Sequence, residues 1–263
     1  AEAVIVLENF ASTLAQAMAG SAVKHVIVAT MGDLLGFPKG LIVNFVVRTV
    51  AKLVKTYALS GHTKFNDAIA AGRTMTLDRP NLGPQDVAVL QYTGGTTGVA
   101  KGATLLHHTL VANLLASEAW MQPGLKRKKL SGQVTIVCAL PLYHVFAFVT
   151  CGLLGMRTGA LNILIPDPRD MKGTIKTLAK YNINIFQGVN TLFNGLAHQP
   201  GFAKPDFSGL ASTHGGRMAV QEVVARNALA NPPGPPCEAV FHTQTRAGVA
   251  QQRGARVIQG GDD

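Results

Sequence analysis

Short apolar runs alternate with amphipathic segments along most of this 263-residue chain. The short runs predict strands, and longer segments with apolar residues at helical spacing predict helices. A connection of helix length returns the chain to the same end of a sheet, so successive strands run parallel. We therefore predict an α/β fold of largely parallel sheets flanked by helices. The predicted strands are 23–29, 87–92, 134–140, 161–165 and 183–188, and the predicted helices are 41–57, 108–121, 144–156, 170–180 and 190–198.

The run 90–102, LQYTGGTTGVAKG, has the composition of a phosphate-binding loop. Glycines let the backbone turn tightly and aim successive N–H groups at an anion. Thr93, Thr96 and Thr97 add hydroxyl donors, and Lys101 adds a positive charge suited to a polyphosphate. The preceding run 87–90 predicts a buried strand, and ligands of parallel sheets bind at the carboxyl ends of strands. The alternative is a glycine-rich surface turn.

Spacing excludes two better-known phosphate loops. A Walker loop needs G-x-x-x-x-G-K-[ST], whereas Lys101 lies between Ala100 and Gly102. A dinucleotide fingerprint needs G-x-G-x-x-G, which the run GGTTG does not supply. The loop therefore indicates another class of nucleotide-binding protein.

Composition narrows the set of partners. Hydrophobic residues make up 47% of the chain and charged residues 14%, as in a globular protein, and the formal net charge is +10. Such a charge suits nucleic acid, anionic lipid or anionic substrates. The one dense basic run, 126–129, has no interleaved aromatic residues, so we expect no nucleic-acid partner and a solvated loop after a helix.

Cysteine usage favours a reducing compartment. The three cysteines form no C-x-x-C pair and are odd in number, which predicts neither a disulfide framework nor a metal site. Cys138 and Cys151 lie in apolar surroundings and are expected to be buried. No basic region opens the chain, and the apolar run 145–156 is too short to cross a bilayer. We expect a cytoplasmic protein.

The predicted helix 41–57 has two interpretations. One face carries only polar and basic residues, which are Asn44, Arg48, Lys52 and Lys55. A basic amphipathic helix of this kind can lie on an anionic membrane, here the inner face of the cell membrane. It can equally be a surface helix packed on its own domain.

The character of the chain changes after Arg226. The run 231–236, NPPGPP, is incompatible with regular structure, and 241–263 shows neither helical nor strand periodicity. We predict a domain at 1–226 and a poorly ordered tail at 227–263.

Several ordered segments carry a family resemblance. The loop 92–101 followed by GATL, and the turn ALPLYHVFA at 139–147, resemble motifs of bacterial long-chain fatty acid–CoA ligases, members of the adenylate-forming (AMP-binding) superfamily. The segments 44–47, 166–170, 188–193 and 206–210 match the same group. The resemblance covers about residues 4–226 and implies part of the N-terminal adenylation domain.

The resemblance implies a two-step reaction. A fatty acid carboxylate attacks the α-phosphorus of ATP in the presence of Mg²⁺, and coenzyme A then displaces AMP to give a thioester. His144 would orient the carboxylate, and the acyl pocket would include Phe148, Gly188, Val189, Gly215 and Gly216. Phe148 is otherwise an apolar residue of a core helix. The ATP-binding residues would be Tyr92, Thr93, Gly94, Gly95, Thr96, Thr97, Gly98, Val99, Ala100, Lys101, Gly102 and Ala103.

The chain also departs from this family's pattern. Arg217 stands where the family has a small residue, and 237–245 reads CEAVFHTQT in place of a strand that ends in Tyr-Gly-x-Thr-Glu. The ribose-binding Asp and the C-terminal domain with its lysine would lie beyond Asp263. We therefore expect little or no turnover by this chain. Two alternatives are a non-catalytic module that binds a nucleotide, an acyl chain or a membrane surface, and a ligase for another acid.

Overall fold

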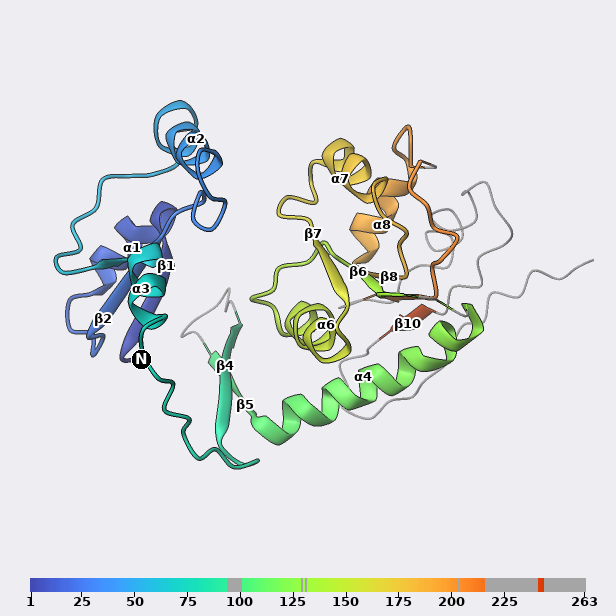
Figure 1. The fold of residues 1–263 in the computed structure, drawn as a ribbon, viewed down its shortest axis with the longest axis horizontal. Coiled ribbons are helices and arrows are strands. Elements are labelled where there is room, and N and C mark those ends of the chain that lie inside the picture. Colours follow the sequence, from blue (N-terminus) through green and yellow to red (C-terminus); the bar gives the residue numbers. More distant parts are fainter. Residues whose placement is uncertain (94–100, 129, 131, 203, 216–240, 244–263) are drawn as a thin grey trace, which may run out of the picture. The chain divides into compact units, whose positions relative to one another are not determined.

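The structure is a computed structural model that describes residues 1–93, 101–128, 130, 132–202, 204–215 and 241–243 (Figure 1). It contains two compact units, Ala1–Asn81 and Leu82–Asp263. The predicted boundary at 226 and most of the predicted tail lie outside the described residues.

The first unit is built on a small parallel sheet. Strands β1 (Ala3–Leu7), β2 (His25–Ala29) and β3 (Thr63–Lys64) lie in that order. The prediction of a strand at 23–29 is confirmed, whereas β1 and β3 were not predicted. Ala11, Val26, Val28 and Leu59 are buried together between the sheet and its helices. Those helices are η1 (Glu8–Phe10), α1 (Ala11–Ala17), α2 (Lys39–Phe45), η2 (Val46–Val50) and α3 (Phe65–Gly72).

The helix predicted at 41–57 runs instead from Lys39 to Val50, as α2 continued by the π-helical η2. It ends early because Lys52 takes a left-handed backbone conformation with φ of 51°. Lys52 and Lys55 therefore lie beyond the helix, which corrects the prediction of one continuous basic face.

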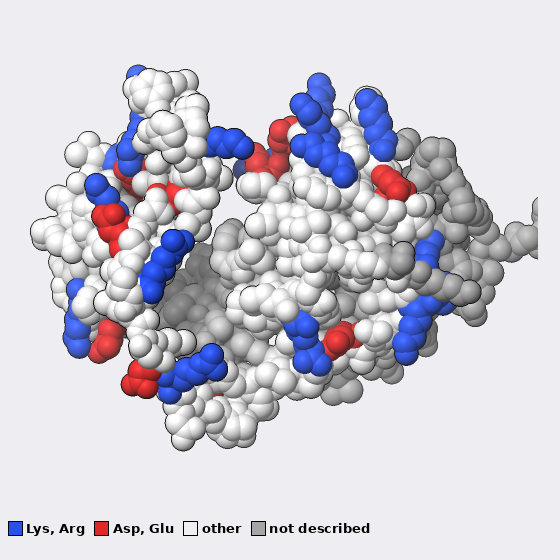
Figure 2. Space-filling model, in the orientation of Figure 1, with Lys and Arg blue, Asp and Glu red and all other residues white. Residues whose placement is uncertain are grey.

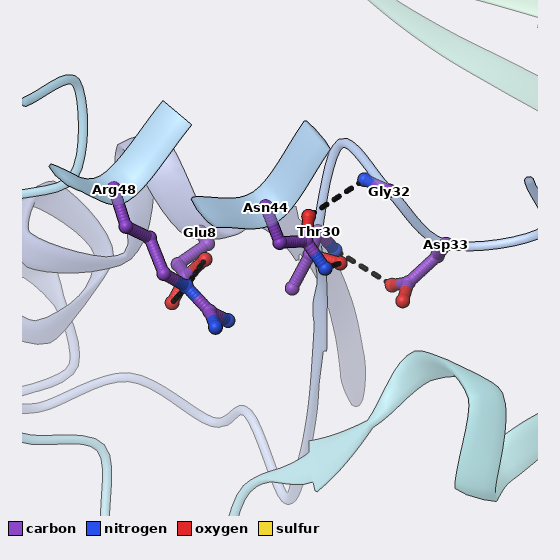
Figure 3. Close-up of polar contacts among 6 residues, drawn as sticks. All are labelled: Glu8, Thr30, Gly32, Asp33, Asn44 and Arg48. Atoms are coloured by element: carbon purple, nitrogen blue, oxygen red, sulfur yellow. Dashed lines mark hydrogen bonds and ion pairs between the residues drawn. The ribbon is translucent and has the colours of Figure 1, made fainter. Parts of the chain in front are cut away.

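The polar side of this helix is turned into the unit (Figure 3). Asn44 Nδ2 donates to Thr30 Oγ1 at 2.9 Å, and the backbone N–H of Gly32 donates to Asn44 Oδ1 at 2.7 Å. One turn further on, Arg48 Nε donates to Glu8 Oε2 at 2.9 Å, and Glu8 is buried. These contacts attach α2 and η2 to the end of β2 and to η1 through polar groups.

The second unit contains a five-stranded sheet in the order β10-β9-β8-β6-β7. Every neighbouring pair is parallel, which confirms the α/β prediction. The β6, β7 and β8 strands fall within predicted runs. The chain also forms β10 where no strand periodicity was found, which corrects that expectation for three residues of the tail. The strands are β6 (Thr135–Cys138), β7 (Leu161–Leu164), β8 (Ile185–Gly188), β9 (Ser212–Gly215) and β10 (Phe241–Thr243).

Alternating side chains divide the core of this sheet between its two faces. Val137 and Phe186 pack with residues of α7 (Met171–Leu178) and α8 (Asn190–Ala197). Ile136 and Ile185 pack with Met121 of α4 (His107–Lys128), Cys151 of η3 (Phe148–Leu153) and Leu154 of α6 (Leu154–Thr158). The sheet is therefore covered on both faces, as the sequence pattern predicts (Figure 1).

Helix α4 continues about two turns past the predicted end at 121, through Pro123 and Gly124 to Lys128. Glycine at position 124 lets α4 pack closely on the backbone at Ala211, since a side chain there would collide with the Ala211 carbonyl. Residues 126–128 form the last turn of α4, which corrects the prediction of a loop, and cations at this end complement the helix dipole. Lys128 Nζ also donates to the Ser208 carbonyl at 3.1 Å. In the described part of the chain, no helix is both long and apolar enough to cross a membrane.

The attachment of α2 gives a first prediction. Asn44→Ala removes both hydrogen bonds and leaves Thr30 and Gly32 without this partner, so we expect the free energy of unfolding to fall by about 1–3 kcal/mol. Urea unfolding of the first unit measures the change. Thr49→Ala, at an exposed position of the same helix, is the control and should stay within about 0.5 kcal/mol of the parent. Equal stability of both variants would contradict this account of the attachment.

Candidate functional site

The predicted phosphate loop lies between the two strands of a hairpin. Strands β4 (Val87–Thr93) and β5 (Lys101–Leu106) pair antiparallel and form a sheet of their own. This corrects the prediction of a buried strand in a parallel sheet, since Val87 and Leu90 are each 54% exposed. A short loop can close a hairpin but cannot carry a crossover. The helix predicted at 108–121 is confirmed as part of α4, which begins at His107.

The register of the hairpin brings the two ends of the loop together. Thr93 pairs with Lys101 and Tyr92 with Gly102, and Ala103 follows in β5. A side chain at position 102 would lie 3.2 Å from the Tyr92 ring, so glycine there leaves room for the ring. Five of the twelve predicted ATP-binding residues are thus strand residues. The other seven, which are Gly94, Gly95, Thr96, Thr97, Gly98, Val99 and Ala100, lie outside the described residues.

A second group of predicted residues meets at the carboxyl ends of the parallel strands. Gly188 at the end of β8 pairs with Gly215 at the end of β9. A side chain at position 188 would come within 2.6 Å of the Phe193 ring, which itself packs edge-on against Phe186. The Phe193 ring therefore leaves room only for glycine at position 188. Val189 follows, half-buried, at the start of α8, and Gly216 lies outside the described residues.

His144 caps a short helix after β6. Its ring Nδ1 accepts from the backbone N–H of Phe146 at 3.2 Å, and the backbone N–H of His144 donates to the Pro141 carbonyl at 3.0 Å. The capped helix is α5 (Val145–Ala147). Because Nδ1 is an acceptor here, the proton of the neutral imidazole belongs to Nε2. The turn therefore fixes the orientation of a half-buried ring whose outer nitrogen is a donor.

Phe148 begins η3, the helix that packs against the same sheet ends. It is half-buried, whereas Val149 and Cys151, which follow it, are buried. The Cys138 sulfur and burial together raise the pKa of the Cys151 thiol, so this thiol stays protonated. Both cysteines are buried, as predicted. In the described ranges, His, Cys, Asp and Glu form no group of three that could hold a metal ion.

Sequence reasoning missed a chain of buried polar groups beneath these strand ends. His214 Nε2 lies 3.0 Å from Ser212 Oγ, and His214 Nδ1 lies 3.1 Å from Gln187 Oε1. Gln187 Nε2 in turn donates to the Thr150 carbonyl of η3 at 3.4 Å. The available signal was three polar residues within two strands, but β9 reads Ser-Thr-His-Gly and has no apolar run. These contacts join β9 and β8 to η3 through buried polar side chains.

Gly188 gives a second prediction. Gly188→Ala places a methyl group against the Phe193 ring in a packed core, so we expect about 1–3 kcal/mol of destabilisation. Urea unfolding of the second unit is the measurement. The matched control is Gly83→Ala, where the nearest atom to an added Cβ is Asp86 Oδ2 at an ordinary 3.6 Å. Equal stability of the two variants would show that the ring does not restrict position 188.

Comparison with known proteins places these features in one family. The profile of the family described as AMP-binding enzyme matches residues 2–241. The chain is 46% identical over 225 residues to a long-chain-fatty-acid–CoA ligase of Escherichia coli O6:H1. That match covers 86% of this chain and 39% of the relative. A long-chain-fatty-acid–CoA ligase of Bacillus subtilis is 30% identical over 203 residues, 76% of this chain and 35% of that protein.

Solved structures support the fold. The anthranilate CoA ligase AuaEII, solved with anthranoyl-AMP, superposes with a TM-score of 0.64 at 19% identity, covering 93% of this chain and 41% of the other. ATP-bound MatB from Rhodopseudomonas palustris gives a TM-score of 0.56 at 20% identity, covering 87% of this chain and 42% of the other. The chain thus spans about two fifths of the proteins it matches.

Proposed function

The chain belongs to the AMP-binding enzyme family, and from that premise we propose that it is part of a ligase that activates long-chain fatty acids. The fatty acid carboxylate would attack the α-phosphorus of ATP and release pyrophosphate, and the coenzyme A thiol would then displace AMP from the acyl-adenylate. One observation carries the proposal. The Thr93–Lys101 register closes a loop of glycine and threonine in a chain that is 46% identical to a protein of that name.

The hairpin residues have the chemistry of a polyphosphate site. Residues from Thr93 to Lys101 would hold the β- and γ-phosphates through N–H groups, hydroxyls and one ammonium, while Tyr92, Gly102 and Ala103 would hold the loop ends. Such groups stabilise phosphoryl charge by position and need no proton transfer. Mg²⁺ would be bound largely by the oxygens of ATP itself, since this ion keeps few protein ligands. Coenzyme A is the proposed second co-substrate.

The sheet ends would form the acyl side of the site. The cap at Nδ1 leaves the Nε2–H of His144 as the donor that would orient the carboxylate. Gly188, Val189, Gly215 and Gly216 would form the pocket wall, because the register sets Gly188 beside Gly215 at the carboxyl ends of parallel strands, where ligands of such sheets bind. Phe148, half-buried on the adjoining helix, would line the acyl channel.

A second candidate is a module that binds the nucleotide or the acyl chain and turns over slowly or not at all. Two sequence departures favour it. Arg217 is a bulky cation where the family resemblance implies a small residue, and Cys237–Thr245 contains no Glu after its strand. Steady thioester formation from ATP, coenzyme A and a long-chain fatty acid would exclude this candidate.

We also propose that the protein acts in the cytoplasm and associates peripherally with the inner face of the membrane. The free cysteines support the cytoplasm, which is a reducing compartment. The net positive charge supports association with an anionic membrane surface.

Calorimetric titration of the full chain with Mg-ATP tests the nucleotide site. Lys101→Ala removes the ammonium and Thr96→Ala a hydroxyl, so each should weaken binding, by roughly tenfold or more for the charge. Lys172→Ala, an exposed lysine of α7, is the control and should bind as the parent does. Absence of binding by a folded chain, or equal binding by all variants, would contradict the proposal.

A further inference from the structure

The first unit exposes a dense set of large apolar side chains around α2 and η2. These side chains are between 43% and 87% exposed, with Phe37 at 87% and Phe45 at 62%. We call this set the α2 apolar surface. It consists of Leu34, Leu35, Phe37, Leu41, Ile42, Phe45, Val46, Val50 and Leu53.

The surface exists because the helix is attached by its polar side. Asn44 bonds to Thr30 and Gly32, and Arg48 pairs with the buried Glu8 (Figure 3). These contacts direct the polar residues inward, so the apolar side of the same helix faces outward. The usual orientation of a surface helix is the reverse. Contiguous apolar surface of this kind marks an interaction site.

Charge around the surface selects the partner. Residues 34–66, which follow Asp33, contain no Asp or Glu. They contain Lys39, Lys52, Lys55 and Lys64, besides Arg48, whose charge is paired with Glu8. Lys39, Lys52 and Lys55 are exposed at the two ends of the helix and just beyond it. Figure 2 shows the region of α2 as mostly uncharged surface with Lys and Arg beside it.

Apolar residues with a border of lysines fit an anionic lipid surface better than a protein. Lysine is depleted at protein interfaces, whereas anionic headgroups attract lysines and the acyl boundary accepts Phe, Leu and Ile. We infer that the α2 apolar surface is a membrane-docking surface that inserts into the interface of an anionic bilayer. The inference deepens the proposed membrane association and does not depend on the ligase chemistry.

Sedimentation with vesicles tests the apolar contribution. The full chain is mixed with vesicles of phosphatidylcholine containing 30% phosphatidylglycerol (about a third anionic lipid, as suits an electrostatic test), and with phosphatidylcholine alone. We expect binding to the anionic vesicles, and a fall of about tenfold or more in the partition coefficient for Phe37→Ser/Phe45→Ser. The control, Met75→Ser/Leu77→Ser, changes two residues of the same unit that are 71% and 74% exposed, and should bind as the parent does.

The charge contribution is tested with Lys52→Gln/Lys55→Gln, for which we expect a loss of roughly fivefold per lysine at low salt. Lys172→Gln/Lys176→Gln, on α7, is its control. Unchanged Mg-ATP binding and unchanged urea unfolding show that the variants are folded, and failure of ATP binding alone leaves this inference standing. No binding to anionic vesicles at low salt would overturn it. A lipid-independent dimer in sedimentation velocity that the Phe37/Phe45 variant abolishes would also overturn it, in favour of a second copy.

Discussion

The central constraint on the second unit is the pairing of β8, which bonds on both edges to parallel strands. All four of its residues are buried, and its register sets Gly188 beside Gly215 and Gln187 beside both Cys138 and His214. Since the partners are parallel, their carboxyl ends meet at one edge, as ligand sites of open α/β sheets require. The turn after β6 that carries His144 begins at the same edge.

The polar chain from Ser212 through His214 and Gln187 to Thr150 depends on that register. Ser212 and His214 are two residues apart in β9 and so face the same side, toward η3. Buried polar groups are costly unless they are satisfied, and here the imidazole has a partner at each nitrogen. The first unit follows the same rule: burial of Glu8 requires Arg48, and this pairing turns the apolar side of the helix outward.

The sequence predicts these features unevenly, for physical reasons. Short apolar runs identify β6, β7 and β8. The β6 and β8 strands are buried throughout, as strands covered on both faces of a parallel sheet are, whereas β7 lies at the sheet edge and exposes Leu161 and Leu164. The strand β9, with the sequence Ser-Thr-His-Gly, was missed because it has no apolar run. Its buried His214 is stabilised by a hydrogen bond with Gln187, which is distant in the chain and cannot be paired with it from the sequence. Periodicity predicts that α2 has a polar and an apolar face, but it does not predict which face points inward. That orientation depends on the contacts with Thr30 and Glu8. Of the candidate site, the residue types of the loop and the turn were predictable, whereas the hairpin register was not.

Amide hydrogen exchange of the full chain, with and without saturating Mg-ATP, tests the central claim most directly. If the hairpin and the sheet ends form one nucleotide and acyl site, exchange slows in peptides that cover residues 87–106, with a smaller effect at 185–189. If bound Mg-ATP slows exchange only within residues 1–81, or leaves 87–106 unchanged, the site has been placed on the wrong part of the chain.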